Sequence, residues 1–169
     1  MDQVVTAVDC TGGVVVGHDG SRPSAGAVRW AAGLAARLGC PLHVIRAWAL
    51  SSAPRPATWS PGYVPPLTDF EEAVLGQLRQ DVDALGLDPG VDVDCHVLHG
   101  SSTRRLVEAS QGAEMLVVAS RGRGGFRGLM LGSTAGQLVG HADCPVVVVP
   151  AREDEDDDPA EPDAQLRRS

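Results

Sequence analysis

The chain has 169 residues and a mass of 17.6 kDa, which favours a single domain with one hydrophobic core. Apolar residues make up 43% of the sequence and aromatic residues only 4%, so aliphatic side chains must form most of that core. All fourteen basic residues are arginine. Mechanisms that need a lysine amine, such as a Schiff base or a Walker-type phosphate loop, are therefore excluded.

The formal net charge of −8 is concentrated near the C-terminus. Residues 151–169 hold eight acidic side chains against three arginines, and we expect them to form a disordered acidic tail. The rest of the chain has only a small negative balance. Neither part offers the broad positive field that nucleic acid requires, so we expect no nucleic-acid partner.

The cysteines and the apolar segments indicate the cellular compartment in which we expect the protein. Cys10, Cys40, Cys95 and Cys144 are far apart and form no CxxC pair, as is typical of a protein in a reducing cytoplasm. No window reaches the roughly 18 apolar residues of a membrane span, and the N-terminus lacks a basic region followed by an apolar run, so we expect a soluble cytoplasmic protein. Cys144 and His141 alone are too few ligands for a metal site, and none built from side chains is expected.

The first expected elements are a buried strand, a helix and a second strand. After a leader, residues 1–11, an apolar run closed by glycine spans residues 13–17, which predicts a strand covered on both faces. Ser21 is the expected N-cap of the following helix, and Gly39 its left-handed C-cap. Residues 42–48 form the second apolar strand.

A proline-rich segment, residues 52–66, follows the second strand. It is longer than a simple connection requires, so it is either a lid over a ligand or a surface excursion. Thr68 is the expected N-cap of a second helix, whose apolar stripe runs from Phe70 to Leu85.

The next strand has a different pattern from the first two. Residues 91–97 alternate apolar and polar side chains, which predicts an edge strand with one wetter face and places His96 and His99 on the surface. The remaining expected elements are a helix from Ser101 or Ser102, a buried strand at 115–119, a short helix at 133–141 and a last strand at 146–149.

Strands and helices therefore alternate along the whole chain. This order predicts an α/β fold, a single doubly wound domain with a five-stranded parallel sheet covered by helices on both faces. Such sheets bind ligands at the carboxyl ends of the strands, near the point where strand order reverses. Functional residues should follow the first, second and fourth strands.

The end of the fourth strand has the composition of a phosphate site. Residues 119–128 are rich in glycine and arginine, and residues 132–134 place backbone amides and two hydroxyls at a helix N-terminus, where phosphate is favoured. Arg121, Arg123 and Arg127 supply positive charge. The alternative is a flexible crossover with solvated arginines.

These residues resemble a known family, the universal stress proteins of bacteria and archaea. Its ATP-binding members carry the pattern G-x2-G-x9-G-[ST] after the fourth strand, and Gly122, nine residues, Gly132 and Ser133 match its last part. The runs at residues 16–21 and 144–149 are similar to the family as well.

The resemblance implies an adenine nucleotide α-hydrolase-like fold over residues 12–150. It also implies binding of ATP with Mg²⁺, the ion being held mainly by phosphate oxygens and water, and a homodimer formed through the last strand. The four valines from Val146 to Val149 favour a dimer independently, because they would otherwise leave an apolar edge exposed.

Carried over to this chain, the nucleotide site of the family comprises nine residues. Asp19 would contact the ribose or the metal-phosphate region, and Ala47 would meet the adenine through its backbone. The nine residues are Gly17, Asp19, Ala47, Ala119, Arg121, Gly122, Gly132, Ser133 and Thr134. From the residues alone, Asp19 has a second interpretation as a cap of the first helix together with Ser21.

Ala119 departs from the family, because it stands where the pattern has its first glycine. A methyl group there is expected to crowd the ribose, and alanine disfavours the positive φ that glycine allows.

The resulting prediction is an ATP-binding, dimeric signalling module of a stress response. No GxSxG or HExxH motif is present, and we assign no catalytic residue. Two alternatives remain open. One is a dimeric stress scaffold that no longer binds nucleotide, and the other is a slow ATPase in which His18 orients a water molecule.

Overall fold

The computed structural model describes residues 3–122 and 130–151. Its elements are β1 (Val14–Gly17), α1 (Arg22–Leu38), β2 (Leu42–Trp48), α2 (Leu67–Asp83), β3 (Val93–His99), α3 (Ser102–Ala109), β4 (Met115–Ala119), α4 (Ser133–His141) and β5 (Val146–Val149). The five strands form one parallel sheet in the order β3-β2-β1-β4-β5. The predicted α/β fold and its strand count are confirmed.

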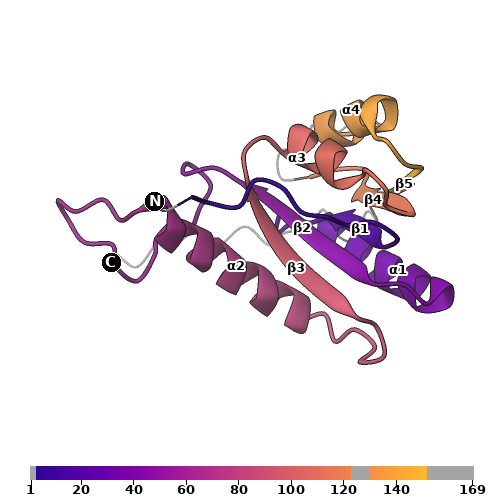
Figure 1. Ribbon diagram of the computed structural model, residues 1–169, viewed down its shortest axis with the longest axis horizontal. Coiled ribbons are helices and arrows are strands. Elements are labelled where there is room, and N and C mark those ends of the chain that lie inside the picture. The colour runs from indigo at the N-terminus through magenta and orange to yellow at the C-terminus, as the bar shows by residue number, and fades with distance from the viewer. Residues whose placement is uncertain (1–2, 123–129, 152–169) are drawn as a thin grey trace, which may run out of the picture.

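Helices cover both faces of this sheet (Figure 1). One hydrophobic cluster lies between the sheet and helices α1 and α2, and a second lies between the sheet and helices α3 and α4. The valines of β1 are fully buried and alternate between the clusters, with Val14 and Val16 in the first and Val15 in the second. A strand that is apolar on both sides is the expected sequence for the centre of such a sheet.

The caps of α1 agree with the sequence, whereas the start of α2 does not. Ser21 accepts a hydrogen bond from the Ser24 amide, and Gly39 ends α1 in the left-handed region with φ 63°. Helix α2 begins at Leu67 after Pro66, so Thr68 is a helical residue and its prediction as N-cap is wrong. The fixed φ of proline suits the cap position and starts the helix earlier.

Strand β3 is an edge strand, as its alternating pattern predicts, but its histidines are not freely exposed. The N-terminal segment crosses this part of the sheet (Figure 1), and the His99 amide donates to the Val5 carbonyl at 2.9 Å. His96 and His99 are both half-buried, and the His99 ring contacts Trp48 edge-on at 4.8 Å between centroids.

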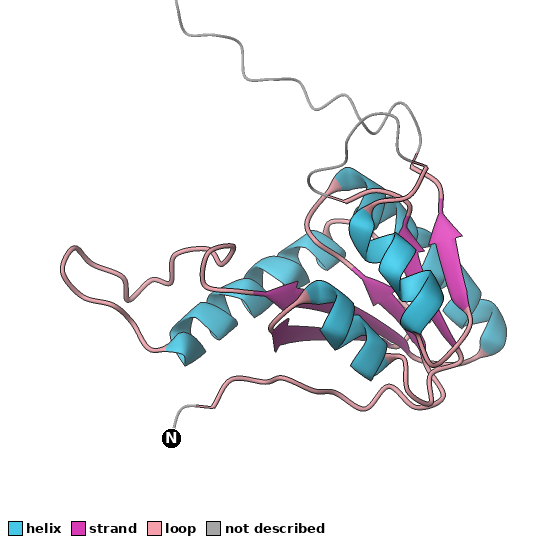
Figure 2. Cartoon of the chain, turned by 90° about the horizontal axis from the view of Figure 1, so that it is seen from above, coloured by secondary structure: helices cyan, strands magenta, loops and turns pink. Residues whose placement is uncertain are grey.

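The proline-rich segment projects away from the sheet between β2 and α2 (Figure 2). Most of its residues are exposed. No helix in the described parts of the chain is long and apolar enough to cross a membrane. The expected acidic tail lies outside the described residues, apart from Ala151.

Candidate functional site

A cavity of about 580 Å³ opens at the carboxyl ends of the central strands. This volume lies within the range of roughly 300–1,000 Å³ that small-molecule sites occupy. All nine residues expected to form a nucleotide site line it: Gly17, Asp19, Ala47, Ala119, Arg121, Gly122, Gly132, Ser133 and Thr134. They come from β1, β2, β4 and the start of α4, so the fold brings distant parts of the sequence to one place.

The sequence did not indicate the apolar part of the cavity. Ile45 from β2, Leu106 from α3 and Val118 from β4 also line it, and all three belong to the hydrophobic cluster under α3 and α4. They looked like ordinary core residues. Ile45 stands two residues before Ala47 and Val118 stands beside Ala119, which could have linked these two to the site, whereas nothing in the sequence links Leu106 to it.

The start of α4 provides the best place for an anion. Gly132 is its N-cap, and its amide donates to the Ser120 carbonyl at 2.7 Å, which holds the helix against the end of β4. The amides in the first turn of a helix have no partner within the helix, and Ser133 and Thr134 of this first turn line the cavity. Their partial positive charge favours phosphate oxygens.

Asp19 lines the cavity and also orders the turn before α1. One carboxylate oxygen accepts a hydrogen bond from the Ser21 amide at 2.9 Å, which orders the turn before α1. The other lies 2.7 Å from the point where a Cβ on Gly122 would stand. Among the described residues, Asp19 is the only acidic side chain that lines the cavity. A side chain at position 122 would require this carboxylate to move.

His18 lines the cavity but is buried. Only 5% of the residue is exposed. Its Nδ1 lies 2.8 Å from the Ser24 hydroxyl, and its Nε2 lies 3.5 Å from an Asp81 oxygen. Burial lowers the pKa of His18, although Asp81 and Asp19 oppose that shift. Both ring nitrogens thus face protein groups.

The structure shows the backbone conformation of Ala119. This residue ends β4 and pairs with Val149 of β5, so its backbone is extended and needs no positive φ. Its side chain packs partly against the cluster under α1 and α2. The positive φ that glycine allows is therefore not used at this position, and the expected crowding of the ribose by the methyl group stays a prediction.

Two other predictions for this region have different outcomes. Arg121 lines the cavity, whereas Arg123 and Arg127 lie outside the described residues. None of residues 52–66 is among the cavity-lining residues that the structure describes, which favours a surface excursion over a lid.

Comparison with known proteins assigns the family. The model of the universal stress protein family matches residues 12–150. A universal stress protein of Mycolicibacterium smegmatis is 36% identical over 146 residues, which cover 81% of this chain and 47% of the relative. The chain belongs to the universal stress protein family. It spans about half the length of the curated relatives it matches.

Solved structures of the same family share the fold. A universal stress protein in complex with cAMP matches with a TM-score of 0.58 and 25% identity, over 85% of this chain and 100% of that one. UspA from Lactobacillus plantarum matches with a TM-score of 0.63 and 18% identity, over 84% and 99% of the two chains. The second likeness concerns the fold alone.

Proposed function

We propose that this chain binds ATP in the cavity at the ends of β1, β2 and β4, as a regulatory nucleotide of a stress response. The observation that carries the proposal is the convergence of nine residues from separate segments on one cavity. The related structure that contains cAMP supports an adenine nucleotide as the ligand.

Each part of ATP has a matching part of the cavity. The backbone of Ala47 would meet the adenine, and the apolar side chains of Ile45, Leu106 and Val118 would exclude water around it. The amides of Ser133 and Thr134 would hold the phosphates. Gly122 and Gly132 line the cavity without side chains, which would leave room for those oxygens.

Mg²⁺ fits the same site as an ion that accompanies the phosphates. Magnesium keeps several water ligands and binds through phosphate oxygens with one or two carboxylates. Asp19 is the carboxylate that the described part of the cavity offers. Bound in this way, Mg²⁺ would neutralise phosphate charge near the start of α1.

Regulation, rather than turnover, suits the groups around the cavity. A hydrolase needs a base within hydrogen-bond reach of the attacking water, and the ring nitrogens of His18 face Ser24 and Asp81 instead. Slow hydrolysis remains testable, since phosphate release that survives in Asp19→Ala would indicate contamination rather than activity of this chain.

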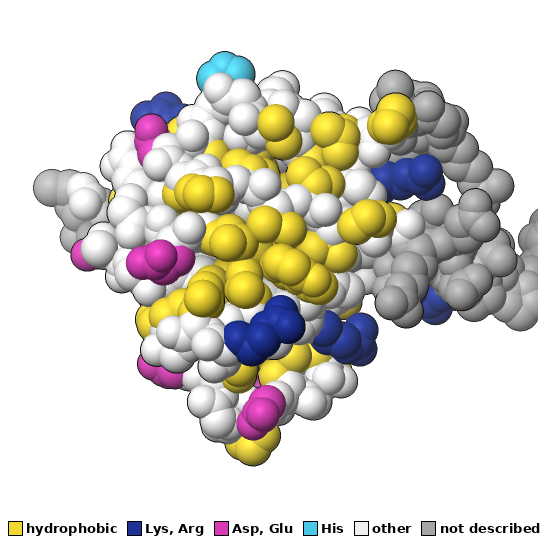
Figure 3. All heavy atoms as spheres, turned by 90° about the vertical axis from the view of Figure 1, so that its right-hand side faces the viewer, with side chains coloured by type: hydrophobic (Ala, Val, Ile, Leu, Met, Phe, Trp, Pro, Cys, Tyr) yellow, Lys and Arg dark blue, Asp and Glu magenta, His cyan; other side chains and the backbone are white. Residues whose placement is uncertain are grey.

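We further propose a homodimer formed through β5. Its four valines are only half-buried, and β5 is an edge of the sheet. Figure 3 shows a broad apolar area on the side of the molecule where β5 lies. Trp30 and Leu38 of α1 and Val139 of α4 are exposed large apolar residues of the adjoining helices. Two copies of this chain have about the length of one curated relative.

Isothermal titration of the nucleotide-free protein with Mg²⁺ and ATP tests the nucleotide proposal. We expect saturable binding to one site per chain. In Gly122→Ala the new methyl group would meet the Asp19 carboxylate, so affinity should fall by roughly tenfold or more, about 1.4 kcal/mol.

Gly140→Ala is the matched control, because a Cβ at Gly140 of α4 meets nothing within 4 Å. It should bind ATP as the unmodified protein does. Absence of binding in folded protein would instead support the nucleotide-independent scaffold.

A further inference from the structure

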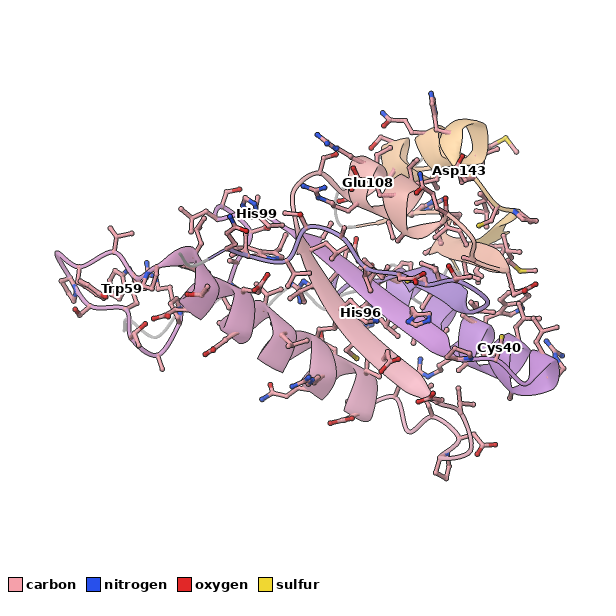
Figure 4. All side chains as sticks on the ribbon, viewed as in Figure 1. Cys40, Trp59, His96, His99, Glu108 and Asp143 are labelled. Atoms are coloured by element: carbon pink, nitrogen blue, oxygen red, sulfur yellow. The ribbon has the colours of Figure 1, made fainter. Side chains whose placement is uncertain are left out.

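Three side chains that the nucleotide proposal does not use converge on the face of β2 and β3. His43 Nδ1 lies 3.1 Å from His96 Nε2 and 3.9 Å from an Asp94 carboxylate oxygen. One ligand atom from each residue lies within 4.8 Å of the other two. Figure 4 marks His96 on β3, beside β2.

The strand register explains why these residues meet. In the parallel pair of β2 and β3, His43 stands opposite Asp94, and Ile45 stands opposite His96. Side chains two residues apart point to the same face of a sheet, so Asp94 and His96 both flank His43. The sequence shows only an isolated histidine on one strand and an alternating strand elsewhere, which is why no metal ligand was expected.

We propose that His43, Asp94 and His96 bind a zinc ion. Two nitrogens bound to a tetrahedral zinc at about 2.0 Å lie about 3.3 Å apart, close to the 3.1 Å between the two imidazoles. Two histidines with one carboxylate form a common three-ligand zinc set that leaves the fourth position for water. Asp94 is exposed and can approach by rotation of its side chain.

His43 is held in position before any metal binds. A Cβ on Gly13 would lie 2.5 Å from its Cδ2 and 2.7 Å from its Nε2, so the ring occupies space that only glycine at position 13 leaves open. The residue is 8% exposed, which leaves its Nδ1 fixed toward His96.

The proton balance is simple. Without an ion, one imidazole N–H can donate to the facing nitrogen of the other ring. Zinc needs a lone pair on both facing nitrogens, so the donor ring must move its proton to its other nitrogen. Neutral histidines bind the ion through this tautomer change without net proton release.

The zinc site is independent of ATP binding. His43 stands near the start of β2 and Ala47 near its end, about 13 Å apart along the strand at about 3.3 Å per residue. None of the three ligands lines the nucleotide cavity. Zinc binding should therefore survive in Gly122→Ala.

Titration of the full chain with ZnCl₂, without nucleotide, tests the proposal. We expect one zinc per chain and a higher melting temperature in zinc, because an ion that binds the folded state stabilises it. His96→Gln and Asp94→Asn should each weaken binding by roughly tenfold or more, as the loss of a group that supports a metal site does.

The chain offers matched controls for each change. Asp92→Asn alters an exposed acid close to Asp94, and His141→Gln alters a histidine on α4; both should bind zinc normally. Because cysteines also bind zinc, Co²⁺ is used as a spectroscopic probe. A cobalt spectrum without a thiolate charge-transfer band is expected.

Three results would overturn the proposal. They are the absence of saturable zinc binding at micromolar concentrations, unchanged affinity in a folded His96→Gln protein, and a thiolate band that Cys95→Ser removes.

Discussion

His18 shows how a single residue beside the cavity can link pH to stability. Its ring lies between Ser24 of α1 and Asp81 of α2, while buried Arg46 lies 3.9 Å from the same Asp81 carboxylate. Burial is the largest influence and lowers the pKa of His18, with Arg46 acting in the same direction and Asp81 and Asp19 in the opposite one. Protonated His18 is therefore disfavoured in the folded protein.

Stability should consequently fall on acidification. The unfolded chain takes up a proton on this histidine near pH 6.5, whereas the folded chain does so only at lower pH. The contribution of His18 is thus present above about pH 6.5 and is lost as the pH falls below it. Urea unfolding at about pH 7.5 and about pH 5.5 should show a smaller loss of free energy in His18→Gln than in the unmodified protein.

Equal losses in the two proteins would contradict this explanation. His99→Gln provides the control, because that ring packs on Trp48 at the end of β3. It should retain the full pH dependence.

At the scale of elements, α2 contains a position where a substitution should raise the stability of the protein. Gly76 lies in the middle of this helix and is exposed, and a Cβ added there would meet no atom within 4 Å. Because glycine is about 1 kcal/mol less favourable than alanine inside a helix, Gly76→Ala should raise the free energy of unfolding by about that amount. Thermal unfolding should shift upward by about 2–4 °C.

The same substitution should have the opposite effect at Gly112. This residue has φ 72°, and a Cβ there would lie 2.8 Å from the Thr11 hydroxyl oxygen. Gly112→Ala should therefore lower the melting temperature. A lower melting temperature in Gly76→Ala would show that contacts of α2 with the rest of the protein outweigh the helix propensity of the residue at this position.

Elements with a strong local signal were predictable from the sequence. The apolar run of β1, the Ser21 cap and the glycine at position 39 each specify their structure through neighbouring residues. The nine cavity residues follow strand ends, and the resemblance to a known family implied them, although only Gly122, Gly132 and Ser133 match its spaced pattern. The pairing of His43 with His96 was not predictable, since it depends on the register of β2 and β3.

At the scale of the whole molecule, we expect the face that carries β5 to form the proposed dimer interface. Val139 of α4 is 57% exposed beside this edge, whereas Val64 is 78% exposed in the projecting proline-rich segment. A carboxylate buried in an apolar interface loses its hydration, so Val139→Asp should convert the dimer to a monomer. Val64→Asp should remain a dimer.

Light scattering at micromolar concentration distinguishes these states. A monomeric mass for the unmodified protein would exclude the proposed dimer at that concentration. A dimer that persists in Val139→Asp would show that the interface does not include this residue of α4.

The most direct test of the central claim is a crystal structure of this chain with Mg²⁺ and ATP. We expect adenine beside Ala47 and phosphates on the amides of Ser133 and Thr134, with the Ala119 methyl group accommodated. A nucleotide bound outside this cavity, or crystals grown in saturating ATP with an empty cavity, would contradict it.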